Sequence, residues 1–213
     1  MKNVILLAPP AAGKGTLAKQ LEEKYGFVQL STGDMLRERA EEDQELKEMM
    51  STGKLINDEL VFEALKSKLN KLGDIPYILD GFPRTVAQAV MYDELLKEMN
   101  KDLGVVIYLD VDKEELKNRV VTRLVCPKCK KSYSTRNKDL FPKEEGLCDN
   151  CKEELIQRAD DSEEVFNSRY EEYLTKTSPL VDYYESRGLL ERITEVAIDK
   201  VFEEASEMIK WLL

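Results

Sequence analysis

The chain of 213 residues contains no histidine. Imidazole is therefore excluded as base, acid and metal ligand, and any chemistry must use carboxylates, Lys, Arg, thiolates or a bound metal. Long apolar runs are also absent. None approaches the roughly 20 residues of a membrane-spanning helix, and Pro9-Pro10 interrupts the N-terminal run before it has the length of a secretory signal. We therefore expect a cytoplasmic protein without a membrane partner.

Basic residues are in the minority, with 32 Lys and Arg against 42 Asp and Glu and a formal net charge of −10. Non-specific binding to nucleic acids or anionic membranes uses basic surface, so we expect no nucleic-acid partner. An anionic small molecule is not excluded, because a local cluster of arginines can outweigh the overall charge.

Five short apolar runs have the character of strands buried on both faces, because they are continuous rather than alternating. Amphipathic helical patterns lie between them, for example at 59–72 and 112–124. Strands that alternate with helices predict an α/β fold with a five-stranded parallel sheet flanked by helices. The expected strands are 4–7, 27–30, 75–79, 105–111 and 189–193.

A glycine-rich turn follows the first expected strand, in the segment VILLAPPAAGKGT. A strand that leads through such a turn into a helix aims backbone N–H groups and the positive helix end at an anion. Lys14 would reach phosphate oxygens, and Gly13 and Gly15 would let the backbone approach them. The alternative is an ordinary strand–helix turn with a chance Gly-Lys-Gly. The P-loop pattern would also have glycine at Ala8, and its Ser/Thr arrives one residue late, at Thr16.

Two more polar segments follow expected strands. In DGFPRT, Asp80 comes at the carboxyl end of a strand, where it could hold Mg²⁺ through water, and Arg84 would face anionic oxygens. In STGDMLR, a helix N-cap precedes Arg37 by about one turn. The alternatives are a simple turn with a surface arginine and a helix start without any function.

Four arginines flank a cysteine-rich insert. Arg119 and Arg123 are four residues apart and are predicted to share one helix face. Arg158 and Arg169 follow the insert. Each could be an ordinary solvated side chain, but together they could close over phosphates, which the guanidinium fork binds with two hydrogen bonds.

The four cysteines form two Cys-x2-Cys pairs separated by 18 residues. This spacing predicts a tetrahedral zinc site. Disulfides are the alternative, and they are uncommon in cytosolic proteins. Four thiolate ligands leave no open coordination position, so the zinc would be structural. The ligands would be Cys126, Cys129, Cys148 and Cys151.

Taken together, STGDMLR, GKLINDELV, LDGFPRT and the four-cysteine insert resemble the adenylate kinases, in their long bacterial form with a zinc-bearing lid. The resemblance covers nearly the whole chain. It implies a P-loop NTPase-type core, a helical AMP-binding lobe and a zinc-ribbon-like lid. It further implies a monomer that transfers a phosphoryl group from Mg²⁺-bound ATP to AMP, giving two ADP. The implied divisions are 1–31, 59–124 and 158–213 for the core, 32–58 for the lobe and 125–157 for the lid.

The resemblance also implies roles for individual residues. The ATP side matches Ala11, Ala12, Gly13, Lys14, Gly15, Thr16, Arg119 and Arg123. The AMP side matches Thr32, Arg37, Lys54, Ile56, Gly81, Arg84 and Gln88, the last at the adenine edge. Catalytic roles fall on Lys14, Arg84, Arg119, Arg123, Arg158, Arg169 and Asp80, the last orienting Mg²⁺ through water. Asp160 and Asp161 match an acidic pair at the lid hinge.

The chain departs from the family pattern in the loop, where Ala8 and Ala11 replace the first two glycines. An alanine held in the left-handed region costs roughly 1–2 kcal/mol. Ala8 ends a strand, so we expect negative φ there, whereas Ala11 lies in the middle of the loop. Near Ile193 the chain also lacks the short glycine-containing turn expected beside the ATP adenine, which leaves that contact unassigned.

Three other functions compete with this interpretation. The protein could phosphorylate a different nucleoside monophosphate, or it could bind nucleotides without catalysis because of the altered loop. The retained arginines argue against the second of these. A zinc-ribbon protein that binds nucleic acid is disfavoured by the negative net charge.

Overall fold

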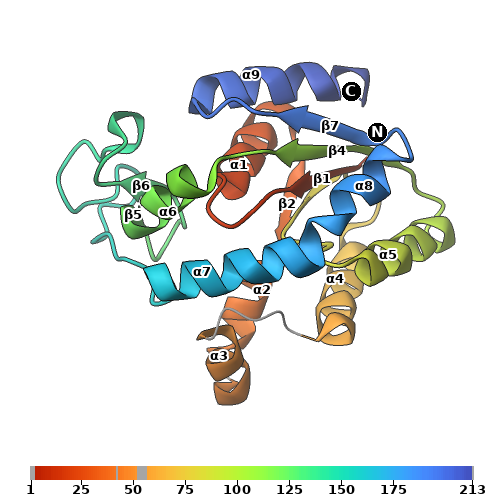
Figure 1. Ribbon diagram of the computed structural model, residues 1–213, viewed down its shortest axis with the longest axis horizontal. Coiled ribbons are helices and arrows are strands. Elements are labelled where there is room, and N and C mark those ends of the chain that lie inside the picture. The colour runs from red at the N-terminus through yellow and green to blue at the C-terminus, as the bar shows by residue number, and fades with distance from the viewer. Residues whose placement is uncertain (1–2, 42, 52–56, 213) are drawn as a thin grey trace.

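The computed structural model describes residues 3–41, 43–51 and 57–212. Its centre is a five-stranded parallel sheet in the order β2-β3-β1-β4-β7, which confirms the predicted fold class (Figure 1). The strands are β1 Asn3–Leu7, β2 Val28–Ser31, β3 Tyr77–Asp80, β4 Leu103–Leu109 and β7 Leu190–Ile193.

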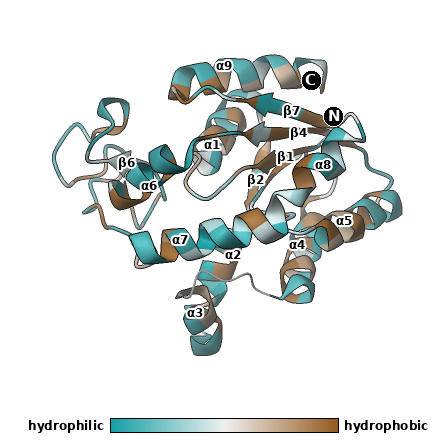
Figure 2. Ribbon diagram, viewed as in Figure 1, coloured by the Kyte–Doolittle hydropathy of each residue, from teal (hydrophilic) through white to brown (hydrophobic). Residues whose placement is uncertain are grey.

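Alternate residues of the central strand β1 enter two different hydrophobic clusters. Ile5 and Leu7 belong to one cluster, while Val4 and Leu6 belong to the other, and all four are at most 2% exposed. Helices cover both faces, so the strands have no polar side and read as continuous apolar runs. Figure 2 shows these hydrophobic strands at the centre, with more hydrophilic helix surfaces outside.

The flanking helices fall between the strands as the sequence pattern predicts. On one face α1 Lys14–Tyr25 packs beside α9 Ile198–Ile209. Helices of the other cluster include α4 Asp58–Leu72, α5 Val86–Glu98 and α8 Pro179–Glu185. The helix α7 Glu163–Glu172 runs through a π-helical turn, Tyr173–Thr177, into α8.

Two smaller units extend from the sheet (Figure 1). One holds α2 Thr32–Arg39 and α3 Gln44–Ser51. The other holds the antiparallel strands β5 Arg123–Val125 and β6 Ser132–Ser134, followed by the short helix η1 Lys138–Leu140. Lys54 and Ile56, predicted on the AMP side, lie outside the described residues. No helix in the described ranges is long and apolar enough to cross a membrane.

One helix prediction was wrong at its end. The helix α6 is Lys113–Val121 rather than 112–124, and Arg123 lies in β5. The hydroxyl of Thr122 donates to the Asn118 carbonyl at 2.8 Å, and the chain then becomes extended to pair with β6. Arg119 and Arg123 therefore do not share a helix face.

Strand ends also differ from prediction by one or two residues. The strand β3 begins at Tyr77, because Ile75 is 48% exposed and Pro76 has no N–H to donate to a neighbouring strand. The strand β4 begins and ends two residues earlier than expected.

Candidate active site

A cleft of about 1430 Å³ opens at the carboxyl edge of the sheet, between the α2 unit and the β5–β6 unit. This edge is where ligands bind in open parallel sheets. Of the predicted nucleotide-side residues, all that are described line this cleft. They are Ala11, Ala12, Gly13, Lys14, Gly15, Thr16, Thr32, Arg37, Asp80, Gly81, Arg84, Gln88, Arg119, Arg123, Arg158, Asp160, Asp161 and Arg169.

The loop after β1 has the geometry of an anion cradle. Gly13 caps α1 with φ 99°, and Lys14 is the first residue of the helix. The Lys14 ammonium donates to the carbonyls of Ala8 at 3.1 Å and Pro9 at 3.3 Å, so it folds back over the loop. Helix N–H groups, the positive helix end and this cation thus meet at one place.

Asp80 lies at the end of β3, beside the loop. It pairs in register with Leu6 of the neighbouring β1. Its Oδ2 accepts from Gln29 Nε2 at 3.0 Å and lies 3.6 Å from where a Cβ on Gly15 would be. A carboxylate at this position can hold a hard cation next to phosphates bound at the loop. Gln29 was not predicted from the sequence, although an amide within an apolar strand was a usable signal.

The remaining cations of the cleft repel one another. Desolvation lowers the pKa of Arg84 to about 10, and the nearby Arg169 lowers it as well. Desolvation also lowers the pKa of Arg158, with Arg123 and Arg37 acting in the same direction. Such mutual repulsion is relieved by a polyanion, so the cleft has an electrostatic preference for phosphates.

Three of these arginines are held by carboxylates. Asp34 Oδ1 lies 2.6 Å from Arg37, and Arg123 Nε donates to the buried Asp161 at 2.7 Å. Asp160 pairs with Arg169. Desolvation raises the pKa of Asp160, but Arg169, with Arg37 and Arg158 acting in the same direction, outweighs it and the net shift is downward. The adjacent Asp160 and Asp161 therefore each hold one arginine of the cleft, Arg169 and Arg123 respectively.

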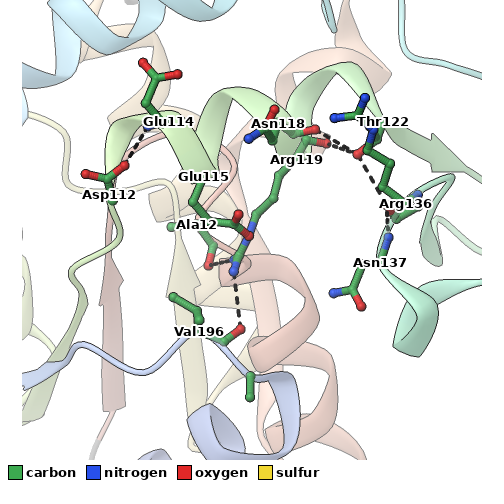
Figure 3. A network of polar contacts seen from close by, with 12 residues as sticks. Ala12, Asp112, Glu114, Glu115, Asn118, Arg119, Thr122, Arg136, Asn137 and Val196 are labelled. Carbon is green, nitrogen blue, oxygen red and sulfur yellow. Dashed lines mark hydrogen bonds and ion pairs between the residues drawn. The ribbon is translucent and has the colours of Figure 1, made fainter.

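Arg119 connects three elements at the outer end of the loop (Figure 3). Its Nε donates to Glu115 at 2.7 Å, its Nη1 to the Ala12 carbonyl at 3.3 Å and its Nη2 to the Val196 carbonyl at 3.2 Å. Val196 lies in the C-terminal segment for which the sequence offered no contact. The three bonds place a flat guanidinium beside the loop.

Thr32 and Gln88 lie at the α2 side of the cleft. The Thr32 hydroxyl donates to the Gly81 carbonyl at 2.8 Å, and Gln88 Oε1 accepts from the backbone N–H of Arg84 at 2.7 Å. Thr177, in the π-helical turn, donates to the Arg84 carbonyl at 2.8 Å. Thr177 was not predicted from the sequence, since nothing near it in the chain indicates a contact 93 residues away.

The four cysteines meet at one point of the β5–β6 unit. Their Sγ atoms all lie within 4.8 Å of one another, and none of the four forms a disulfide. Cys129 Sγ and Cys148 Sγ are 3.6 Å apart. Zn–S bonds of about 2.3 Å in a tetrahedron put the sulfurs about 3.8 Å apart. The donor set and its spacing therefore fit a tetrahedral metal.

Comparison with known proteins agrees with this geometry. A family model described as adenylate kinase matches residues 6–189. The chain is 43% identical to an adenylate kinase of Thermotoga petrophila over 99% of this chain and 98% of the relative. It is 47% identical to one of Archaeoglobus fulgidus over 88% of both, and 40% identical to one of Pseudothermotoga lettingae over 98% of both.

The chain belongs to the adenylate kinase family. Membership of this family identifies the protein as a phosphotransferase. The loop nevertheless differs from the family's glycine-rich form at Ala8 and Ala11. Ala11 has φ 66°, in the left-handed region, whereas Ala8 does not have positive φ. The expectation that Ala11 is the strained position is confirmed.

The two alanines should respond to glycine with opposite signs. Ala11→Gly removes roughly 1–2 kcal/mol of strain against an entropy cost of about 0.4–1 kcal/mol, so we expect net stabilisation between about zero and about 1.6 kcal/mol. Ala8→Gly relieves no strain, brings the same entropy cost and removes a buried methyl group from the hydrophobic cluster of Val4 and Leu6, so we expect it to destabilise the fold. Denaturant unfolding of wild type and both single variants measures this, and ATP titration should show tighter binding only for Ala11→Gly. A larger gain from Ala8→Gly would contradict the geometry.

The charge of Lys14 should depend on pH in the working range. Desolvation lowers its pKa to about 8, with Asp80 opposing the shift and Arg84 and Arg123 adding to it. Phosphates at the loop would stabilise the ammonium and raise this pKa. ATP binding should therefore take up protons between about pH 8 and 9 and weaken as the pH rises through this range.

Calorimetric titration in two buffers of different ionisation enthalpy measures this proton uptake. The reference is the same pair of titrations at pH 6.5, where Lys14 is already charged and its uptake should vanish. Proton release at pH 8.5, or no uptake there, would contradict the role given to Lys14.

Proposed function

We propose that the protein catalyses the reversible transfer ATP + AMP = 2 ADP, with ATP at the loop side of the cleft and AMP at the α2 side. The observation that carries this assignment is the convergence of Lys14 and seven arginines, the six predicted ones and Arg136, on one cleft that has an anion cradle at one end. The α2 side holds Thr32, Arg37 and the Gln88 amide, which suit a second, smaller nucleotide. Membership of the adenylate kinase family supports the same assignment.

The chemistry follows from what these side chains can do. Phosphoryl transfer through a loose transition state needs alignment and neutralisation of charge rather than a protein nucleophile. Lys14 would bind the donor phosphates, and Arg84 and Arg169 would face the transferring group. This agrees with a chain that has no histidine. The hydroxyl of Thr32 and the amide of Gln88 would orient AMP for in-line attack.

Asp80, steadied by Gln29, fits the position that would hold Mg²⁺. When bound with ATP, Mg²⁺ neutralises part of the phosphate charge. The protein groups retain the task of holding both nucleotides in line, and a closed cleft would exclude water that could otherwise accept the phosphoryl group.

We further propose the division into core, AMP lobe and lid at the boundaries given above. Two backbone hydrogen bonds, at 2.8 and 3.0 Å, join Val125 to Ile156. They bring the two ends of the proposed lid segment together, which supports its description as a separate unit. Zinc bound by the four cysteines would hold this unit together. We propose that the protein acts as a monomer.

A comparison of acceptors tests the proposal. With ATP as donor, kcat/KM for AMP should exceed that for GMP, CMP and UMP. A preference for another nucleoside monophosphate would replace adenylate by that substrate, and nucleotide binding without turnover of any acceptor would favour a non-catalytic binding protein.

A further inference from the structure

The side-chain amide of Gln88 is fixed by two partners of opposite character. Its Nε2 donates to Asp58 Oδ1 at 2.6 Å, and its Oε1 accepts from the backbone N–H of Arg84 at 2.7 Å. The residue is only 2% exposed, yet it lines the cleft. The Gln88 amide is therefore fixed by two protein partners at a position that borders the cleft.

These partners define which end of the amide is oxygen and which is nitrogen. A carboxylate can only accept a hydrogen bond and a backbone N–H can only donate one. Turning the amide by 180° would set the Gln88 oxygen against the Asp58 carboxylate and its NH₂ group against the Arg84 N–H. Both contacts would then be repulsive, so the turned amide is strongly disfavoured.

The amide keeps one free donor and one free acceptor in this fixed order. An amide has two N–H groups and two oxygen lone pairs, and among the described residues Asp58 and Arg84 take one of each. Adenine offers an amino N–H and a ring nitrogen acceptor. Hypoxanthine offers the reverse, a carbonyl oxygen and a ring N–H. A freely turning amide could pair with either base, whereas a fixed one pairs with only one of them.

Asp58 is not needed as a helix cap. It is the first residue of α4, but the side chain of Asn57 already accepts from the backbone N–H groups of Glu59 and Leu60. The two Asp58 oxygens instead reach the start of α5, where Oδ2 accepts from the Thr85 hydroxyl at 3.1 Å and Oδ1 accepts from Gln88. Its carboxylate is thus directed at the base-reading amide.

We propose that Asp58 is a positioning residue that sets the base specificity of the acceptor site by fixing the orientation of the Gln88 amide. This rests on the proposed function, in which Gln88 contacts the acceptor base. Asp58 itself does not touch the substrate. It makes the amide complementary to a 6-aminopurine and opposed to a 6-oxopurine.

Asp58→Asn tests this, because the near-isosteric amide can donate as well as accept, so that only the Arg84 N–H then opposes the turned orientation, which becomes accessible. The readout is the ratio of kcat/KM for AMP to that for inosine monophosphate, which has the reversed edge without the additional amino group of guanine. The ratio should fall by about 10- to 100-fold, the range of one hydrogen bond to a charged group. Glu59→Gln makes the same change at the next, exposed residue and should leave the ratio unchanged.

The outcomes separate this inference from the proposed function. If Asp58 only tied α4 to α5, Asp58→Asn would lower kcat/KM for both acceptors by the same factor, and the unchanged ratio would overturn the inference alone. Wild type without preference for AMP over inosine monophosphate would overturn the proposed acceptor. Gln88→Ala must also abolish the preference, and a retained preference would show that another group reads the base.

Discussion

Replacing Arg84 with alanine is expected to lower kcat by at least about a thousandfold, the range known for arginines that stabilise a transferring phosphoryl group. The Arg84 guanidinium donates to the Gly81 carbonyl at 2.8 Å, and no carboxylate of a described residue forms an ion pair with it. Its positive charge is therefore available to substrate. Because Arg169 repels it in the free protein, its removal should not destabilise the fold.

Steady-state kinetics should show this loss in kcat and not only in KM, since the interaction is made mainly in the transition state. Arg84→Lys keeps the charge but loses the fork, and should recover only part of the rate. Arg39→Ala removes an exposed arginine of α2 and serves as the control with near wild-type activity. Activity of Arg84→Ala within a factor of two of wild type would show that Arg84 is misassigned.

Replacing Cys148 with serine is expected to remove the metal and unfold the lid. We expect one Zn²⁺ per wild-type chain. The buried cluster of this unit consists of Cys126, Tyr133, Cys148 and Leu155, so half of it consists of the proposed zinc ligands. A unit with so small an apolar core depends on its metal, because the free energy of metal binding is also the free energy of folding.

Metal analysis of protein purified without chelator, together with thermal unfolding, measures this effect. Cys148→Ser should hold far less zinc than wild type and show an early unfolding step, which chelator should reproduce in wild type. Lys128→Ser, at an exposed position within one Cys-x2-Cys pair, should keep both the metal and the stability. A zinc-free wild type of unchanged stability, or a native disulfide among these cysteines, would contradict the assignment.

The features that could be predicted from the sequence are those whose signal lies within a few neighbouring residues. The five strands were visible because helices cover both sheet faces and leave continuous apolar runs. The loop and the cysteine pairs were visible because each motif lies within a few residues. Asp58, 30 residues from Gln88, and Thr177, 93 residues from Arg84, were not. Their contacts arise from the packing of distant elements, which no local spacing records.

The end of α6 is a second case in which contacts between separate segments decide the structure. Here they override a local helical pattern that the sequence does contain. The helical pattern continued to residue 124, but pairing of Arg123 with Ser134 in the β5–β6 unit overrides it. Local preference is a weak prior when a strand partner is available. Arg123 consequently reaches the cleft from a strand, held by Asp161, rather than from the helix that carries Arg119.

The proposed reaction is tested most directly by measuring ADP formation from ATP and AMP in the presence of Mg²⁺, followed by a coupled assay and by ³¹P spectroscopy. We expect two ADP for each AMP consumed, with little ADP or inorganic phosphate when AMP is omitted, because closure of the cleft over both nucleotides would exclude water as acceptor. Absence of ADP in the complete mixture, or phosphate release that does not depend on AMP, would contradict it.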